Sequence, residues 1–214
     1  MKIILNQGQN LYFTSDTHYS HSNICTTTTN WDKSLNSTRD FKSLNHMNDT
    51  IVNNINEVVG QDDILFHLGD WSFGGFEKIE EFRSRILCRN IHLILGNHDE
   101  HIRKNKGNVQ MLFSSAFDYM NLDLRINKGG NFEKYNLILM HYPISSWDGL
   151  SRGSIHLHGH VHLSPHNRVS QGRAMDVGMD GNNYYPISIK EIINIMDKRP
   201  NKQLILSADH HEQV

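Results

Sequence analysis

Hydrophobic residues follow two kinds of pattern along the 214 residues of this chain. Between residues 43 and 59, apolar side chains recur every three or four positions, which predicts a helix with one apolar face. Further helices are predicted over residues 76–87 and 190–196. Short apolar runs predict strands, and they cover residues 2–5, 11–14, 64–68, 91–95, 117–124, 137–140, 174–177 and 185–189. This alternation indicates an α/β fold.

Polar segments separate these elements without marking a second domain. Residues 25–37 are rich in Thr and Asn, and residues 101–108 are rich in charge, so both are predicted to be loops. Pro200 ends the last helix. We expect one domain over residues 1–199 and a weakly ordered C-terminal tail over residues 200–214.

Composition narrows the classes of partner. The hydrophobic share of 37% suits one compact core, and the net charge of -2 gives no overall basic field for nucleic acid or an acidic membrane. A local basic groove for nucleic acid stays open. No apolar run is long enough for a membrane span or signal peptide. Cys25 and Cys88 lack a CxxC spacing, which favours reduced thiols and a cytoplasmic protein.

Histidine is unusually frequent, with 15 copies, and several stand where apolar runs end. Ligands bind at the carboxyl ends of strands in open α/β sheets, so these residues are expected to converge at one site. Five runs end in a potential metal ligand: Asp16 and His18, then Asp70, then Asn97 and His98, then His141, and finally the histidines of residues 158–162.

The last of these groups has three histidines at alternate positions: His158, His160 and His162. Alternate side chains of a strand share one face, so the three rings would point the same way if the strand ran on unbroken. Gly159 lets the backbone turn and approach another group closely. Neutral imidazole is a frequent metal ligand, and the stretch therefore predicts a metal site.

Together these motifs resemble those of the calcineurin-like metallophosphoesterases, in order and in residue type, over residues 11–162. The wider context resembles the small bacterial and phage branch of that family. The motifs are Asp16-x-His18, Gly69-Asp70, Gly96-Asn97-His98-Asp99, Met140-His141 and Gly159-His160-Val161-His162. The resemblance implies a calcineurin-like β-sandwich flanked by helices, in a four-layer αββα arrangement.

The resemblance also implies a role for each motif residue. Asp16, His18, Asp70 and His162 would bind one metal ion. Asp70 would bridge to a second ion, which Asn97, His141 and His160 would also hold. His98 would be the catalytic histidine, outside the metal ligands. Many relatives carry an acid shortly after the second motif that orients this histidine, whereas Trp71-Ser72-Phe73 follows Asp70 here.

The donor set agrees with this assignment. Oxygen and nitrogen ligands without a thiolate fit two divalent ions of Mn, Fe, Ni or Zn. Two such ions and two aspartates leave a net charge of about +2, which suits a phosphate ester. Two metals about 3.5–4 Å apart can lower the pKa of a shared water to near 7, and its hydroxide would attack phosphorus. His98 would donate a proton to the leaving group.

Other residues are candidates for binding the substrate phosphate. His21 and Asn23 follow the first motif closely, and Arg152 is a candidate phosphate clamp, as are Arg39 and Arg168. His158 is more typical of a supporting histidine than of a ligand.

The favoured function is a metal-dependent phosphoric ester hydrolase acting on a small or nucleotide-like phosphodiester. A diester is favoured because its poor alkoxide leaving group needs a proton donor, which His98 supplies. The alternatives are a phosphomonoesterase, a nuclease using the same site, and a non-catalytic scaffold of this fold. A scaffold would lack ligands, and a nuclease would need a basic groove with stacking aromatics. A metallo-β-lactamase would continue its HxH pair with Asp-His, whereas Leu163-Ser164 follows here.

Overall fold

Two five-stranded sheets form the framework of the protein. A computed structural model describes residues 1–30, 38–105, 107–169 and 172–201. The first sheet has the order β1 (Lys2–Leu5), β6 (Tyr119–Lys128), β7 (Asn131–Met140), β8 (Ile155–His158) and β9 (Ala174–Asp176). The second has the order β10 (Ile187–Ser188), β2 (Leu11–Thr14), β3 (Ile64–His67), β4 (Asn90–Ile94) and β5 (Ser115–Phe117).

Parallel pairing dominates both sheets. In the second sheet β2, β3, β4 and β5 are parallel, and only β10 pairs antiparallel, with β2. In the first sheet β7, β8 and β9 are parallel, and β1 is parallel to β6. The antiparallel exception is the long β6–β7 hairpin, which turns at Gly129-Gly130. Consecutive parallel strands therefore end at the same edge of each sheet.

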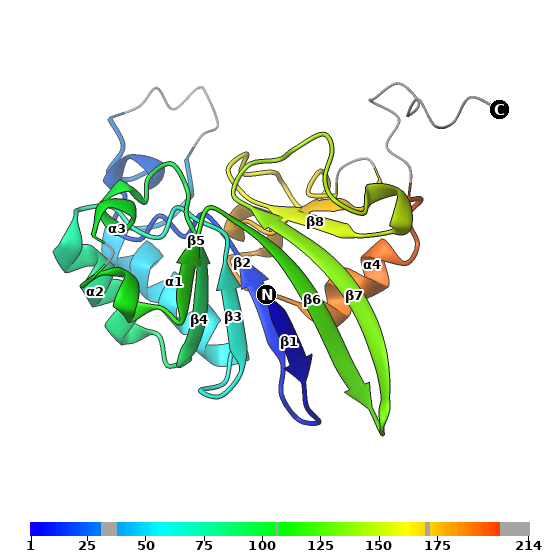
Figure 1. The fold of residues 1–214 in the computed structure, drawn as a ribbon. Helices are drawn as coiled ribbons and strands as arrows, with labels where there is room; N and C mark the ends of the chain where they lie inside the picture. The colour runs from blue at the N-terminus through cyan, green and yellow to red at the C-terminus, as the bar shows by residue number, and fades with distance from the viewer. Residues whose placement is uncertain (31–37, 106, 170–171, 202–214) are drawn as a thin grey trace.

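Helices connect the parallel strands of the second sheet. The α-helices are α1 (Leu44–Val58), α2 (Phe76–Arg85), α3 (Glu100–Lys104) and α4 (Ile189–Met196). Ser43 begins α1 by accepting a hydrogen bond from the backbone N–H of His46, and Ser188 does the same for Glu191 at the start of α4. Figure 1 shows α1 and α2 on one side of the β2–β5 sheet, with β6 and β7 on its other side.

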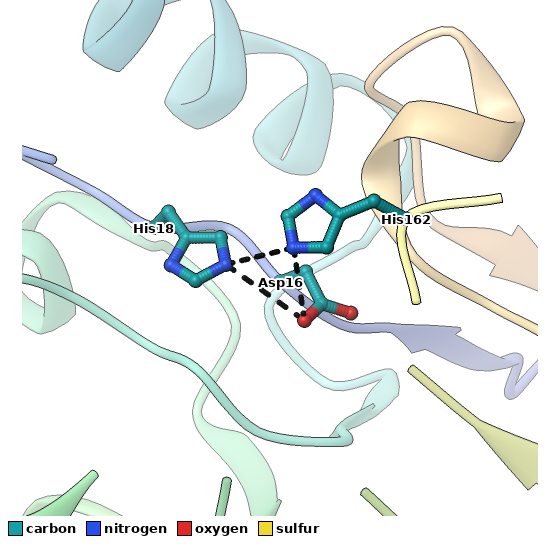
Figure 2. Close-up of side chains that lie close together, drawn as sticks. All are labelled: Asp16, His18 and His162. Atoms are coloured by element: carbon teal, nitrogen blue, oxygen red, sulfur yellow. Dashed lines mark hydrogen bonds and ion pairs between the residues drawn. The ribbon is translucent and has the colours of Figure 1, made fainter. Parts of the chain in front are cut away.

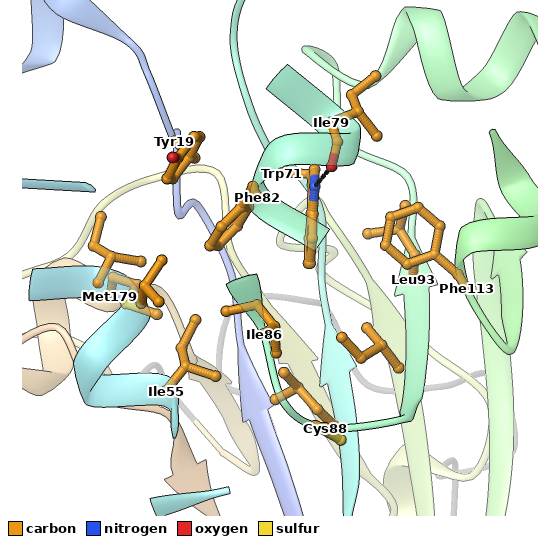
Figure 3. Close-up of a cluster of buried hydrophobic side chains, with 14 of the residues drawn as sticks. Tyr19, Ile55, Trp71, Ile79, Phe82, Ile86, Cys88, Leu93, Phe113 and Met179 are labelled. Atoms are coloured by element: carbon orange, nitrogen blue, oxygen red, sulfur yellow. Dashed lines mark hydrogen bonds between the residues drawn. The ribbon is translucent and has the colours of Figure 1, made fainter. Parts of the chain in front are cut away.

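Two apolar clusters cover the two faces of the second sheet. Phe66 points into the cluster between the sheets, where it meets residues of β6 and β7 such as Leu122. Its neighbour Leu65 points the opposite way, into the cluster beneath α1 and α2. Figure 3 shows Phe82 and Trp71 within that second cluster. The continuous apolar run of β3 thus reflects burial on both faces of the strand.

The predicted class, an α/β sandwich flanked by helices, is confirmed. Three local predictions need correction. The charged segment predicted as a loop begins with α3, the strand predicted over residues 117–124 is interrupted at Asp118, and β7 is much longer than residues 137–140. The longer strand follows from pairing with β6, because the hairpin register runs from Tyr119–Met140 to Lys128–Asn131.

Most of the predicted C-terminal tail, residues 202–214, lies outside the described residues. Within the part of the chain that the structure describes, no helix has the length and apolarity needed to cross a bilayer.

The cluster between the sheets generates a stability prediction. Leu122 is fully buried opposite Leu137, so Leu122→Ala should lower the free energy of unfolding by about 2–5 kcal/mol through lost burial and a residual cavity. Denaturant titration measures this change. The control is Leu87→Ala, at a leucine 54% exposed, where a change below about 0.5 kcal/mol is expected. Equal effects of the two substitutions would contradict the assigned core.

Candidate metal centre

Three parallel strands of the second sheet deliver acidic and amide side chains to one edge. Asp16 follows β2, Asp70 follows β3, and Asn97 follows β4. Because β2, β3 and β4 are neighbours in the sheet, their carboxyl ends lie side by side. Asp16 and Asp70 are buried, whereas Asn97 is exposed.

The first sheet supplies histidines to the same edge. His141 follows β7, and His160 and His162 follow β8, which pairs with β7 in parallel. The strand ends at His158, so the shared face expected of an unbroken strand does not apply to the three histidines. The backbone turns after Gly159, because the His160 N–H donates to the two carboxylate oxygens of Asp16 at 3.1 and 2.9 Å. This turn directs His160 and His162 into two different groups.

Asp16, His18 and His162 form the first group that could hold a metal ion. The Nε2 atoms of His18 and His162 face each other at 3.0 Å. They lie 3.8 and 3.6 Å from Oδ1 of Asp16 (Figure 2). Three potential ligand atoms from β2 and β8 therefore converge on one point.

Asp70, His141 and His160 form the second group that could hold a metal ion. His141 Nε2 lies 3.5 Å from Oδ2 of Asp70 and 3.0 Å from Oδ1 of Asn97. Its other ring nitrogen, Nδ1, lies 2.7 Å from the carbonyl oxygen of Leu68. That contact orients the ring with Nε2 toward Asp70, as the supporting contacts of metal-binding histidines do.

Asp70 stands between the two groups. Its Oδ2 atom is 3.7 Å from His18 Nε2 in the first group and 3.5 Å from His141 Nε2 in the second. Its Oδ1 atom accepts a hydrogen bond from the His98 backbone N–H at 2.9 Å. One carboxylate oxygen is thus held by the main chain while the other faces histidines of both groups.

The backbone is constrained at these positions. Among the described residues, eight non-glycine residues have a positive φ, and five of them belong to the two groups. Left-handed conformations of such residues cost about 1–3 kcal/mol each and persist where the surroundings impose them. The five are Asp16, His18, Asp70, His160 and His162, with φ between 47° and 72°.

Two glycines allow the carboxylates to lie this close to the chain. A Cβ atom at Gly159 would collide with Ser15 Oγ and Asp16 Oδ2, and one at Gly96 would collide with Asp70 Oδ1. Asp99 fixes the same loops, since its carboxylate accepts hydrogen bonds from the backbone N–H groups of Asp70, Trp71 and Gly96. The glycines and Asp99 are therefore part of the framework of the site.

The burial and the pKa values of His18 and Asp16 suit the binding of a cation. Burial lowers the pKa of His18 well below its usual value, which keeps the ring neutral. Burial also raises the pKa of Asp16 to about 6 although His162 and His141 oppose this, so the protein alone compensates its charge incompletely. The buried Nδ1 atom of His18 has no hydrogen-bond partner. Imidazole nitrogens around two carboxylates form a donor set that fits divalent ions.

His98 lies at the rim of the two groups. Its side chain is 43% exposed, and Nε2 is 4.0 Å from Oδ2 of Asp70. The ring packs against Phe73, with 4.7 Å between the ring centroids, and Phe73 in turn stacks on His21. The aromatic ring of Phe73, in the Trp71-Ser72-Phe73 stretch that follows Asp70, thus contacts His98.

A pocket of about 610 Å³ opens over both groups. Its lining includes His21, one of the residues predicted to bind substrate, but neither Asn23 nor Arg152. Asn23 accepts a hydrogen bond from the backbone N–H of Asn30, which holds the loop. Arg152 pairs with Asp148 and lines another depression, so the structure does not bring it to the candidate metal centre.

His158 and Arg39 also differ from the motif ligands. His158 is buried on β8 and belongs to neither metal-binding group. Arg39 is a pocket-lining residue, yet its side chain is 2% exposed and is bound to Asp180. Sequence reasoning missed Asp180, which contacts His162 Nδ1 at 2.8 Å. Asp180 stands shortly after the apolar run of β9. The same signal that identified the other motifs, an acidic residue or histidine after a strand, could therefore have identified it.

Comparison with known proteins identifies the relatives. A family model described as calcineurin-like phosphoesterase matches residues 10–213. An uncharacterized protein of Methanocaldococcus jannaschii is 29% identical over 194 residues, covering 88% of this chain and 92% of its own length. The gene 66 protein of Mycobacterium phage D29 is 27% identical over 210 residues, covering 88% of this chain and 98% of its own length.

A solved structure gives an independent view of the fold. The crystal structure of a protein of unknown function from Aquifex aeolicus matches with a TM-score of 0.60 and 25% identity. The match covers 88% of this chain and the whole of that one. The two proteins therefore share a fold over most of this chain.

The close approach at Gly159 generates a prediction about metal content. Gly159→Ala should displace Asp16, because the new methyl group would occupy the space of its carboxylate. After reconstitution with Mn²⁺, mass spectrometry should find less metal per chain than in the unsubstituted protein. Gly107→Ala is the control, since a Cβ atom there meets nothing within 4 Å. Full metal content in Gly159→Ala would contradict this role of the glycine.

Proposed function

The chain belongs to the calcineurin-like phosphoesterase family, and from this premise we propose that it hydrolyses phosphodiesters with two divalent metal ions. The observation that carries the proposal is the pair of His/Asp groups on either side of Asp70, with His98 exposed beside them. A non-catalytic scaffold of this fold would lack ligands, whereas the motif residues are all present in this chain.

The two groups have separate parts in this proposal. Asp16, His18 and His162 would hold one ion, and His141, His160 and Asn97 would hold the other, with Asp70 shared between them. When bound, two divalent ions at such a site stabilise the charge of the phosphoryl oxygens and lower the pKa of a water molecule to near 7. The protein side chains supply orientation and proton transfer.

His98 is the proposed proton donor. Its exposed Nε2 atom lies on the pocket side of Asp70, where it can reach the leaving oxygen of a bound ester. The backbone N–H of His98 is tied to Asp70 Oδ1, so the residue keeps a fixed relation to the carboxylate shared by both groups. A proton placed on the leaving oxygen avoids the release of a poor alkoxide.

The charges in the pocket favour a diester over a monoester. Among the described residues that line the pocket, Arg39 is the one arginine and there is no lysine. Arg39 is already paired with Asp180, so it does not add a free positive charge for the extra negative charge of a monoester. Ile24, Val161 and Pro165 give the same pocket an apolar wall that suits an organic ester group.

A first prediction tests the role of His98. His98→Ala should keep near-normal metal content and lose about 10²–10⁴-fold in turnover, the usual contribution of a general acid. Metal analysis and steady-state kinetics measure the two quantities. His166→Ala, at an exposed histidine outside the pocket lining, is the control and should match the unsubstituted protein. If His98→Ala lost its metals, His98 would be a ligand instead.

A second prediction tests the ester class. The Mn²⁺-loaded protein should hydrolyse bis(p-nitrophenyl) phosphate with a higher kcat/KM than p-nitrophenyl phosphate. The leaving group is the same in both substrates, so the ratio reports how the site handles the ester itself. A monoester preference of tenfold or more, equal to about 1.4 kcal/mol in the transition state, would make the protein a phosphatase.

A further inference from the structure

Arg39 is a buried arginine whose donors are directed at the metal centre. Its Nε and Nη2 atoms donate to the two carboxylate oxygens of Asp180 at 2.8 and 2.7 Å. Its Nη1 atom donates to the carbonyl oxygen of Thr17 at 3.0 Å, and Nη2 also donates to that of Asp16 at 2.6 Å. All three guanidinium nitrogens are therefore occupied by protein acceptors.

Asp180, which is bound to Arg39, also contacts His162. Its Oδ2 atom lies 2.8 Å from His162 Nδ1, and an ionised carboxylate can only accept a hydrogen bond. The two-pronged contact with the Arg39 guanidinium compensates the negative charge of the Asp180 carboxylate. His162 Nδ1 is thus the donor, which directs Nε2 toward Asp16 and His18.

The same guanidinium fixes the other half of the first group. Asp16 and His18 lie on a turn with φ of 56° and 47°, and the carbonyl groups of Asp16 and Thr17 on this turn accept from Arg39. One side chain therefore ties together the turn that carries two potential ligands and the carboxylate that orients the third.

The second group is held in a different way. His141 Nδ1 faces a backbone carbonyl, that of Leu68, at 2.7 Å. Asp70 is held by the backbone N–H of His98. Within the described part of the chain, neither Arg39 nor Asp180 forms a hydrogen bond or ion pair with His141 or His160.

We propose that Arg39 and Asp180 are positioning residues for one metal ion only, the ion of the Asp16, His18 and His162 group. The inference rests on the proposed function, because it takes both groups to bind metal. Carboxylates that accept from a metal-binding histidine raise its basicity and fix its orientation, and losing them typically weakens metal binding 10–100-fold. Arg39 holds Asp180 in the ionised, correctly placed form that this requires.

The test measures metal binding at each group separately. His141→Ala/His160→Ala isolates the first group, and His18→Ala/His162→Ala isolates the second. Mn²⁺ is titrated into each metal-free variant by calorimetry, with and without Asp180→Asn. Asp180→Asn keeps the shape of the side chain but removes its charge. Affinity at the isolated first group should fall about tenfold or more, and affinity at the isolated second group should change less than about twofold.

Two further variants separate positioning from general destabilisation. Arg39→Lys keeps the charge but cannot form the two-pronged contact with Asp180, so it should also weaken the first group selectively. Asp197→Asn is the matched control, because Asp197 pairs with Arg173, another buried arginine remote from both groups. It should leave both affinities unchanged. Circular dichroism verifies that each variant is folded. If Asp180→Asn does not fold, the affinities measured with Arg39→Lys test the positioning role instead.

The outcomes distinguish the inference from the function on which it rests. Equal losses at both groups, or no loss at either, would overturn the positioning role while leaving two metal sites. If neither isolated group binds Mn²⁺, the dinuclear proposal fails and the inference fails with it. Since no step measures ester hydrolysis, a wrong substrate class would not affect the result.

Discussion

The burial of two carboxylates, those of Asp16 and Asp70, is the constraint on which the site depends. A buried negative charge is costly unless hydrogen bonds and opposite charge compensate it. The backbone N–H groups of His160 and His98 supply part of that compensation. The raised pKa of Asp16, caused by its burial, shows that the protein supplies only part. Imidazole nitrogens complete a donor set that is suited to a divalent ion.

This constraint also accounts for the unusual backbone nearby. The chain reaches the carboxylates closely only because Gly96 and Gly159 have no Cβ atom. It turns back within a few residues, which places potential ligands in left-handed conformations. Asp99 and Arg39 hold the turns by bonding their backbone groups. The stability of the two-sheet core, rather than local preference, keeps these residues in place.

Much of the fold and of the candidate site could be predicted from the sequence. The apolar runs located β2, β3 and β4 because these strands are buried on both faces. Strand ends rich in Asp, Asn and His indicated the convergence that the two candidate metal groups display. The structure does not bring Arg152 to the pocket where it was predicted to bind phosphate. A lone arginine in a loop carries no spacing or pattern that fixes the direction of its side chain. The length of β7 is set by its pairing with β6. The residues of β7 alone do not reveal where that pairing begins and ends.

The sequence by itself determined which residues could serve as ligands and the strand ends at which they stand, because residue type and apolar periodicity are local properties. Only the tertiary structure decided how those residues divide into two groups. The turn after Gly159 sends His160 and His162 apart, and it is imposed by Asp16, which is remote in the sequence. The contact between Arg39 and Asp180 was equally hidden, because it joins residues 141 positions apart that meet only in the folded chain.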